Sequence, residues 1–199
     1  MSSIEDLRET LKRVEEHLDF ARLIYRSLPF VFWAGFIPLL YIVASLATSR
    51  IGQTALGISI GISLSLWFLL EERSAYKVLE KLNTALGKHV ENPKLYIALQ
   101  FASWPIAAFI AYISVYVIGL IESAWPLVFF SSGIGLLIFI DKAFRGIYDK
   151  EMLAVFGLPF ISIPLINHVP LPKEDFAIMI ISSSMALTGF LYIRRAFRT

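Results

Sequence analysis

Long apolar runs alternate with short charged segments along the chain. Six such runs are present, and the Lys, Arg, Asp and Glu residues lie mostly between them. A helix of about 20 apolar residues is long enough to cross a bilayer. The pattern therefore predicts an all-α, polytopic integral membrane protein with six transmembrane helices. The predicted spans are Ser27–Thr48, Ile51–Leu70, Leu95–Ile121, Ser123–Ile140, Met152–Ile166 and Phe176–Ile193.

The fifth run is the shortest and contains Gly157, Pro159 and Pro164. A helix of that length covers about 22 Å, which is less than the roughly 30 Å of the hydrocarbon core. A re-entrant segment is the alternative, because irregular backbone is tolerated at membrane depth when protein surrounds it. A re-entrant segment would place the Arg-rich tail outside the cell. The charge distribution opposes that placement, so six spans are predicted.

The basic residues lie almost entirely on one side of the predicted spans. Apart from Arg50 and Lys173, every Lys and Arg belongs to the N-terminal segment, the second-to-third connection, the fourth-to-fifth connection or the tail. Cytoplasmic flanks of membrane proteins retain Lys and Arg. The distribution therefore predicts an integral plasma-membrane protein with both termini in the cytoplasm.

Composition agrees with a lipid environment. The chain is 57% hydrophobic and 17% charged, with a mean hydropathy of +0.68, whereas soluble domains are about a quarter charged. Because the sequence has no cysteine, disulfides, thiol catalysis and cysteine-ligated metal sites are excluded. The net charge of +2 argues against a nucleic-acid binder.

The predicted outer connections Ser49–Arg50 and Glu122 are very short. Consecutive spans joined this closely are antiparallel neighbours, which predicts three hairpins. The resulting segments are a cytoplasmic amphipathic helix at 1–26, a transmembrane hairpin at 27–70, a cytoplasmic helix at 71–92, a second hairpin at 93–140, a cytoplasmic loop at 141–150, a third hairpin at 151–193 and a basic cytoplasmic tail at 194–199.

Small residues recur one helical turn apart in the even-numbered spans. Such residues let helix backbones approach closely in lipid. They predict either an inner layer formed by spans 2, 4 and 6, or packing of each span within its own hairpin. The candidate packing residues are Gly57, Gly61, Ser131, Gly135, Ser182 and Ala186.

The N-terminal helix carries one narrow apolar stripe. Its apolar residues recur at alternating spacings of three and four over three heptads, the pattern of a coiled-coil seam. The stripe consists of Ile4, Leu7, Leu11, Val14, Leu18, Ala21 and Tyr25.

A second cytoplasmic helix continues from the second span without a helix-breaking residue. Gly87 is its predicted C-terminal cap, and Asn92 and Pro93 are predicted to begin the next helix. The apolar stripe of this second helix consists of Ala75, Val78, Leu79, Leu82, Ala85 and Leu86.

The two cytoplasmic helices together predict a coiled-coil-like stalk. Their net charges are close to zero, whereas a helix lying on a membrane surface is strongly basic on its polar face. Either the two stripes cover each other within one chain, or the seam recruits a second copy or another protein subunit. The longer stripe of the first helix is expected to overhang. The candidate partner-binding residues are Leu7, Leu11, Val14, Leu18 and Leu82.

Chemistry-bearing residues are scarce inside the predicted spans. No charged residue lies between their flanks, and Asp141 is placed at an interface. The three histidines, His17, His89 and His168, show no metal-ligand spacing. No catalytic, cofactor-binding or metal site is predicted. Arg194, Arg195 and Arg198 are expected to contact anionic lipid headgroups.

These observations favour a protein that binds other molecules over one that catalyses a reaction. The leading hypothesis is a non-enzymatic, multi-pass scaffold or regulatory subunit that acts through its cytoplasmic stalk, with the lipid bilayer and a second copy or another subunit as partners. The alternative is a passive channel or uncoupled small-solute transporter, lined by the Ser and Gly faces of spans 2, 4 and 6. An intramembrane enzyme is disfavoured because no acid–base constellation converges.

Overall fold

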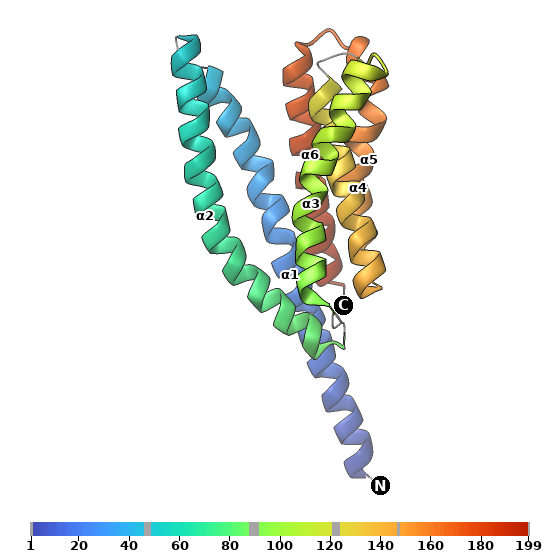
Figure 1. Ribbon diagram of the computed structural model, residues 1–199. Helices are drawn as coiled ribbons and strands as arrows, with labels where there is room; N and C mark the ends of the chain where they lie inside the picture. Colours follow the sequence, from blue (N-terminus) through green and yellow to red (C-terminus); the bar gives the residue numbers. More distant parts are fainter. Residues whose placement is uncertain (1, 46–48, 88–91, 121–123, 147, 199) are drawn as a thin grey trace. The chain divides into compact units, whose positions relative to one another are not determined.

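The computed structural model describes residues 2–45, 49–87, 92–120, 124–146 and 148–198, and within these ranges it contains helices and no strands. Figure 1 follows them in chain order from blue to red. The elements are α1 (Ser2–Ser45), α2 (Arg50–Ala85), α3 (Pro93–Tyr112), the π-helix η1 (Ile113–Val117), α4 (Trp125–Arg145), α5 (Met152–Ser162), the 3₁₀-helix η3 (Pro164–Asn167) and α6 (Lys173–Ala196).

Among the described residues, four helical segments are long and apolar enough to cross a membrane: Asp6–Ser45, Lys94–Val117, Trp125–Arg145 and Lys173–Ala196. They contain the predicted sixth span and most of the predicted first, third and fourth spans. The all-α class is therefore confirmed for the described residues, and the four apolar helices are consistent with a membrane protein, whereas a count of six spans remains a prediction. The predicted second span lies in α2, where many side chains are outside the described set. The predicted fifth span is an 11-residue helix followed by η3.

α1 is a single helix of 44 residues with no break between its polar and apolar parts. The sequence predicted a cytoplasmic helix at 1–26 followed by a span from Ser27. In the structure these two segments are continuous. At 1.5 Å per residue, the polar segment extends the transmembrane part by about 39 Å.

The helix boundaries on either side of residues 88–91 follow the predicted local signals. α2 continues past residue 70 to Ala85, and Gly87 adopts a φ of +70°, which glycine tolerates without steric cost. Asn92 caps α3 by accepting a hydrogen bond from the Leu95 amide at 3.1 Å, and Pro93 occupies the first turn. Both cap predictions are confirmed, because capping depends on residues close in sequence.

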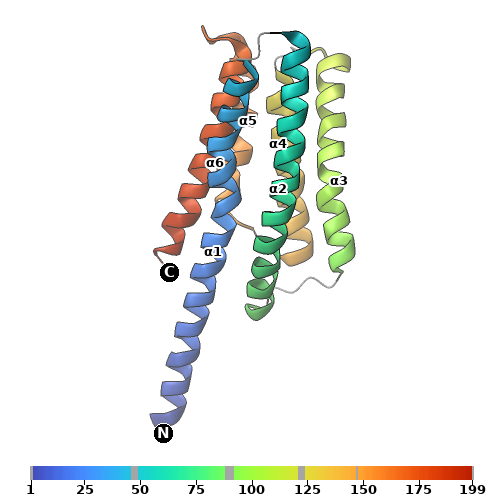
Figure 2. The ribbon, with the colours of Figure 1, turned by 90° about the vertical axis from the view of Figure 1, so that its left-hand side faces the viewer.

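The chain forms two compact units. The first comprises Met1–Phe30, Leu40–His89 and Gly189–Thr199, and the second comprises Val31–Leu39 and Val90–Thr188. In the second unit, α4 lies between α3 and α5 and packs against both (Figures 1 and 2). Its core contains Ala107, Ala111, Leu127, Ile134 and Val155, all of which are buried.

The outer end of α3 differs from the predicted uninterrupted span Leu95–Ile121. The α-helix ends at Tyr112 and continues as the π-helix η1. After Val117 the chain turns at Gly119, whose φ is +84°, and the Leu120 amide donates to the Ser114 carbonyl at 3.0 Å. A positive φ at glycine is a common way to end a helix.

Candidate functional site

The apolar seam of α1 is exposed over its first two heptads. Ile4, Leu7, Leu11 and Val14 have between 50% and 73% of their surface accessible. Leu18 and Ala21 are half-buried, and Leu23, one residue beyond Arg22, is fully buried. The seam is therefore open near the N-terminus and becomes covered toward the predicted membrane.

The second stripe is partly covered within the chain. Leu79, Leu82 and Leu86 are half-buried, and the neighbouring Asn83 is buried. The side chain of Ala75 lies outside the described residues. Of the five candidate partner-binding residues, Leu7, Leu11 and Val14 are thus exposed, whereas Leu18 and Leu82 are intermediate. The pairing of the two stripes, and with it the overhang of the first helix, stays a prediction.

Ion pairs between described side chains of α1 connect residues of opposite charge within the helix. Arg13 Nη2 lies 2.6 Å from Glu9 Oε1, and Lys12 Nζ lies 3.9 Å from Glu16 Oε1. Pairs of this spacing contribute about 0.3–0.5 kcal/mol each. The third pair joins Arg22 Nη2 to Asp19 Oδ1 at 2.7 Å, and there the Arg22 side chain is only 1% exposed.

A polar and aromatic cluster joins α1 to the end of α6 in the first unit. Arg26 Nε donates to Tyr192 Oη at 3.1 Å, and the Arg26 guanidinium lies 6.0 Å from the centre of the Tyr192 ring. Phe30 stacks on Tyr192, and Phe20 meets Phe197 edge to face. Both Arg26 and Tyr192 are buried. No local sequence pattern predicts this cluster, and Arg26 counted only among the basic residues that indicate orientation.

A second buried cluster joins α3 to α4 near their predicted cytoplasmic ends. Tyr96 Oη donates to Asp141 Oδ1 at 2.5 Å and accepts from Gln100 Nε2 at 2.6 Å. The Arg145 guanidinium lies over the Tyr96 ring, 4.4 Å from its centre. The Asp141 carboxylate thus accepts a hydrogen bond from the Tyr96 hydroxyl, and this contact links α3 to α4.

The predicted small-residue faces have different surroundings. Gly57 and Gly61 on α2 are exposed, and nothing lies within 4 Å of where a Cβ would be. On α4, a Cβ at Gly135 would be 3.0 Å from the Phe156 ring of α5, and one at Gly133 would be 2.8 Å from the Trp104 ring of α3. Aromatic rings of α3 and α5, the helices of the third and fifth predicted spans, therefore lie against the glycines of α4.

The hydroxyl-bearing candidates are buried, and the remaining small residue is not. Ser131 donates to the Leu127 carbonyl of its own helix at 2.7 Å. Ser182 is buried, whereas Ala186 on the same helix is exposed. Hydrogen bonding to an earlier carbonyl is the ordinary way for a serine to satisfy its hydroxyl inside a helix.

The three tail arginines lie at or just after the end of α6. Arg194 and Arg198 are exposed, and Arg195 is half-buried. Exposed cations beside the last turn of a predicted transmembrane helix are suited to contact lipid phosphates, each contributing about 1 kcal/mol near an anionic surface.

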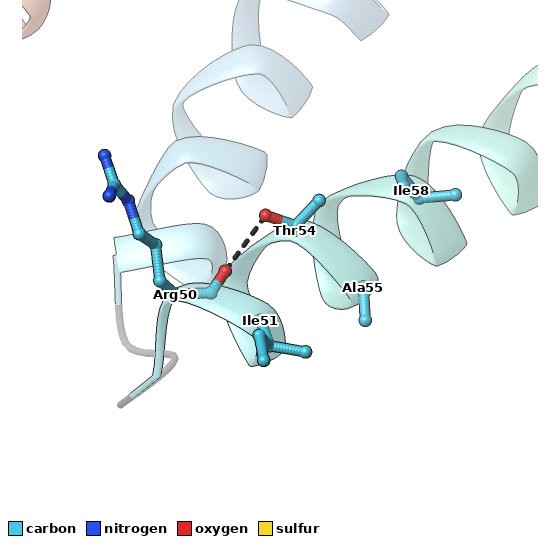
Figure 3. A pocket seen from close by; sticks show the side chains of 5 residues that line it. All are labelled: Arg50, Ile51, Thr54, Ala55 and Ile58. Atoms are coloured by element: carbon cyan, nitrogen blue, oxygen red, sulfur yellow. Dashed lines mark hydrogen bonds between the residues drawn. The ribbon is translucent and has the colours of Figure 1, made fainter.

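A shallow hollow on the first turns of α2 carries no converging polar groups. Figure 3 shows its five lining residues, Arg50, Ile51, Thr54, Ala55 and Ile58, all on one helix. The Thr54 hydroxyl donates to the Arg50 carbonyl at 2.9 Å and is thereby engaged within the helix. The hollow is mainly apolar, in keeping with a lipid-facing surface.

Among the described residues, no group of three or more His, Asp or Glu side chains is placed to hold a metal ion. Comparison with known proteins found no matching family model, no matching curated protein and no matching solved structure.

Proposed function

We propose that the protein is a non-enzymatic, multi-pass membrane scaffold or regulatory subunit whose cytoplasmic stalk binds a partner subunit or a second copy. The observation that carries the proposal is the exposed seam Ile4–Val14 on α1. Apolar side chains at heptad spacing stabilise helix pairing when a second helix covers them. When the seam remains open to water, its apolar side chains do not stabilise the single chain.

The orientation in this proposal has six spans and both termini in the cytoplasm of a plasma-membrane protein. The distribution of Lys and Arg supports it, because the tail arginines and the basic residues of α1 are then on one side. The seam then projects into the cytoplasm, where soluble proteins and the stalks of other copies are accessible.

The buried polar clusters support contact over reaction. Tyr96 engages Asp141, and Tyr192 engages Arg26, so these groups link helices. The alternative channel would line its pathway with Ser131 and Gly135. Instead, the Ser131 hydroxyl donates to a backbone carbonyl, and an aromatic ring lies against Gly135. Solute flux through proteoliposomes would favour the channel over the scaffold.

The test is a double substitution, Leu11→Asp with Leu18→Asp, which places two charges in the seam. We expect the variant to insert into membranes normally and to lose the larger complex when its mass is measured in mild detergent. The matched control is Glu9→Asp with Glu16→Asp, which puts two aspartates on the opposite face of α1 and leaves the complex intact. An unchanged complex mass for the seam variant would contradict the proposal.

A further inference from the structure

We infer that the occupant of the α1 seam is the α1 helix of a second copy running antiparallel, so that two copies join facing membranes. The inference rests on the proposed function and specifies its partner. It comes from the charges that flank the exposed seam and from the continuity of α1.

The seam residues define heptad positions along α1. With Ile4, Leu11 and Leu18 at position a and Leu7 and Val14 at position d, position e is occupied by Arg8 and Glu15. The e and g side chains flank the seam and determine partner and orientation in coiled coils. The corresponding g positions are Ser3, Thr10 and His17.

Arg8 and Glu15 differ from their charged neighbours. Glu9, Lys12, Arg13 and Glu16 form ion pairs within the helix, whereas neither Arg8 nor Glu15 has an ion pair among the described residues. Both side chains are exposed. Two opposite charges beside an open apolar seam are therefore available to a partner.

An antiparallel second copy satisfies both charges at once. When Leu11 lies opposite Val14 of the second copy, both partners are exposed; Leu7 lies opposite its half-buried Leu18, and Ile4 lies opposite its half-buried Ala21, so the bulky Ile4 meets a small residue. In this register the e positions meet each other, and Arg8 lies opposite Glu15 of the second copy. The two-fold symmetry repeats the pair, and opposite charges at such positions favour the register.

A parallel second copy leaves the charges unmatched. In parallel pairs, position g of one helix meets position e of the next heptad on the other helix. Arg8 would then face Ser3, and Glu15 would face Thr10. Neither charge would gain a partner, so the charge pattern favours the antiparallel pair.

The membrane geometry follows from the unbroken α1 helix. Stalks anchored in one membrane with the same orientation point the same way and pair in parallel. Antiparallel pairing therefore joins copies in two membranes whose cytoplasmic faces oppose each other. In the register above, the membrane surfaces would lie about 40 Å apart. Each contact is short, but many copies between the same two surfaces act together.

The test uses full-length protein in two populations of proteoliposomes carrying different lipid dyes, and clustering is followed by energy transfer between the dyes. Native protein is expected to cluster the vesicles. Arg8→Glu and Glu15→Arg place like charges opposite each other, and each alone should raise the protein density needed for clustering about tenfold. Mixing Arg8→Glu vesicles with Glu15→Arg vesicles restores opposite charges and should recover native clustering.

Two control variants distinguish the effect of charges beside the seam from the effect of net charge on vesicle clustering. Lys12→Glu and Asp6→Arg make the same changes in charge away from the seam and should cluster like the native protein. If both e-position variants cluster normally, or if the mixed populations fail to recover, the antiparallel pair is wrong. The proposed function would fail separately, through an unchanged detergent complex in the Leu11→Asp/Leu18→Asp variant.

Discussion

Tyr96 is the residue that most directly connects α3 to α4 through polar contacts. Its hydroxyl satisfies the buried Asp141 carboxylate and accepts from Gln100, while its ring lies under Arg145. A buried carboxylate deprived of its donor retains its desolvation cost without compensation. The contribution of this single hydroxyl to stability is therefore expected to exceed that of an exposed tyrosine.

We expect Tyr96→Phe to lower the free energy of unfolding by about 1–3 kcal/mol, because the buried Asp141 carboxylate loses the hydrogen bond from the Tyr96 hydroxyl. Tyr112→Phe is the matched control, since Tyr112 is 54% exposed. Thermal unfolding in detergent compares the two. Equal midpoints for both variants would show that the Tyr96 hydroxyl does not hold α3 and α4 together.

Residues close in sequence were predicted better than residues brought together by folding. The seam of α1 follows from spacing alone, and Leu7 and Leu11 within it are exposed. By contrast, Tyr96 and Asp141 are 45 residues apart, and no local pattern links them. For that reason Asp141 was predicted to lie at an interface, with no partner assigned to it.

At the scale of elements, local signals account for the caps of α2 and α3 but not for every break. Gly87 and Asn92 act through their immediate neighbours, and both were predicted correctly. The π-helix η1 was not predicted, because apolar composition continues through Ile113–Val117. The continuity of α1 across residues 26 and 27 has the same origin, since nothing there breaks a helix.

Close packing of α4 against α3 depends on the absence of a side chain at Gly133. Alanine there would place its Cβ 2.8 Å from the Trp104 ring, and overpacking of this kind costs about 1–3 kcal/mol. Gly61→Ala meets open space and keeps the gain in helix propensity. We expect Gly133→Ala to be the less stable of the two in thermal unfolding. If Gly61→Ala were the less stable variant, the Trp104 ring would not lie against Gly133 as described.

At the scale of the whole molecule, the described residues are mostly helical and include four helices long and apolar enough to cross a membrane, and α1 continues unbroken from its polar N-terminal part into one of them. What the pattern cannot specify is the occupant of the seam, because one chain's spacing describes only half of an interface. The central claim is accordingly that α1 makes contact through its seam and not through its polar face.

The most direct measurement uses the natural absence of cysteine. A benzophenone maleimide attached to Leu11→Cys would probe the seam, and the same reagent on Glu9→Cys would probe the opposite face of α1. On irradiation in native membranes, we predict that the Leu11 probe joins the chain to a second polypeptide several-fold more efficiently than the Glu9 probe. Equal yields from both positions, or no cross-linked species from Leu11, would contradict the account.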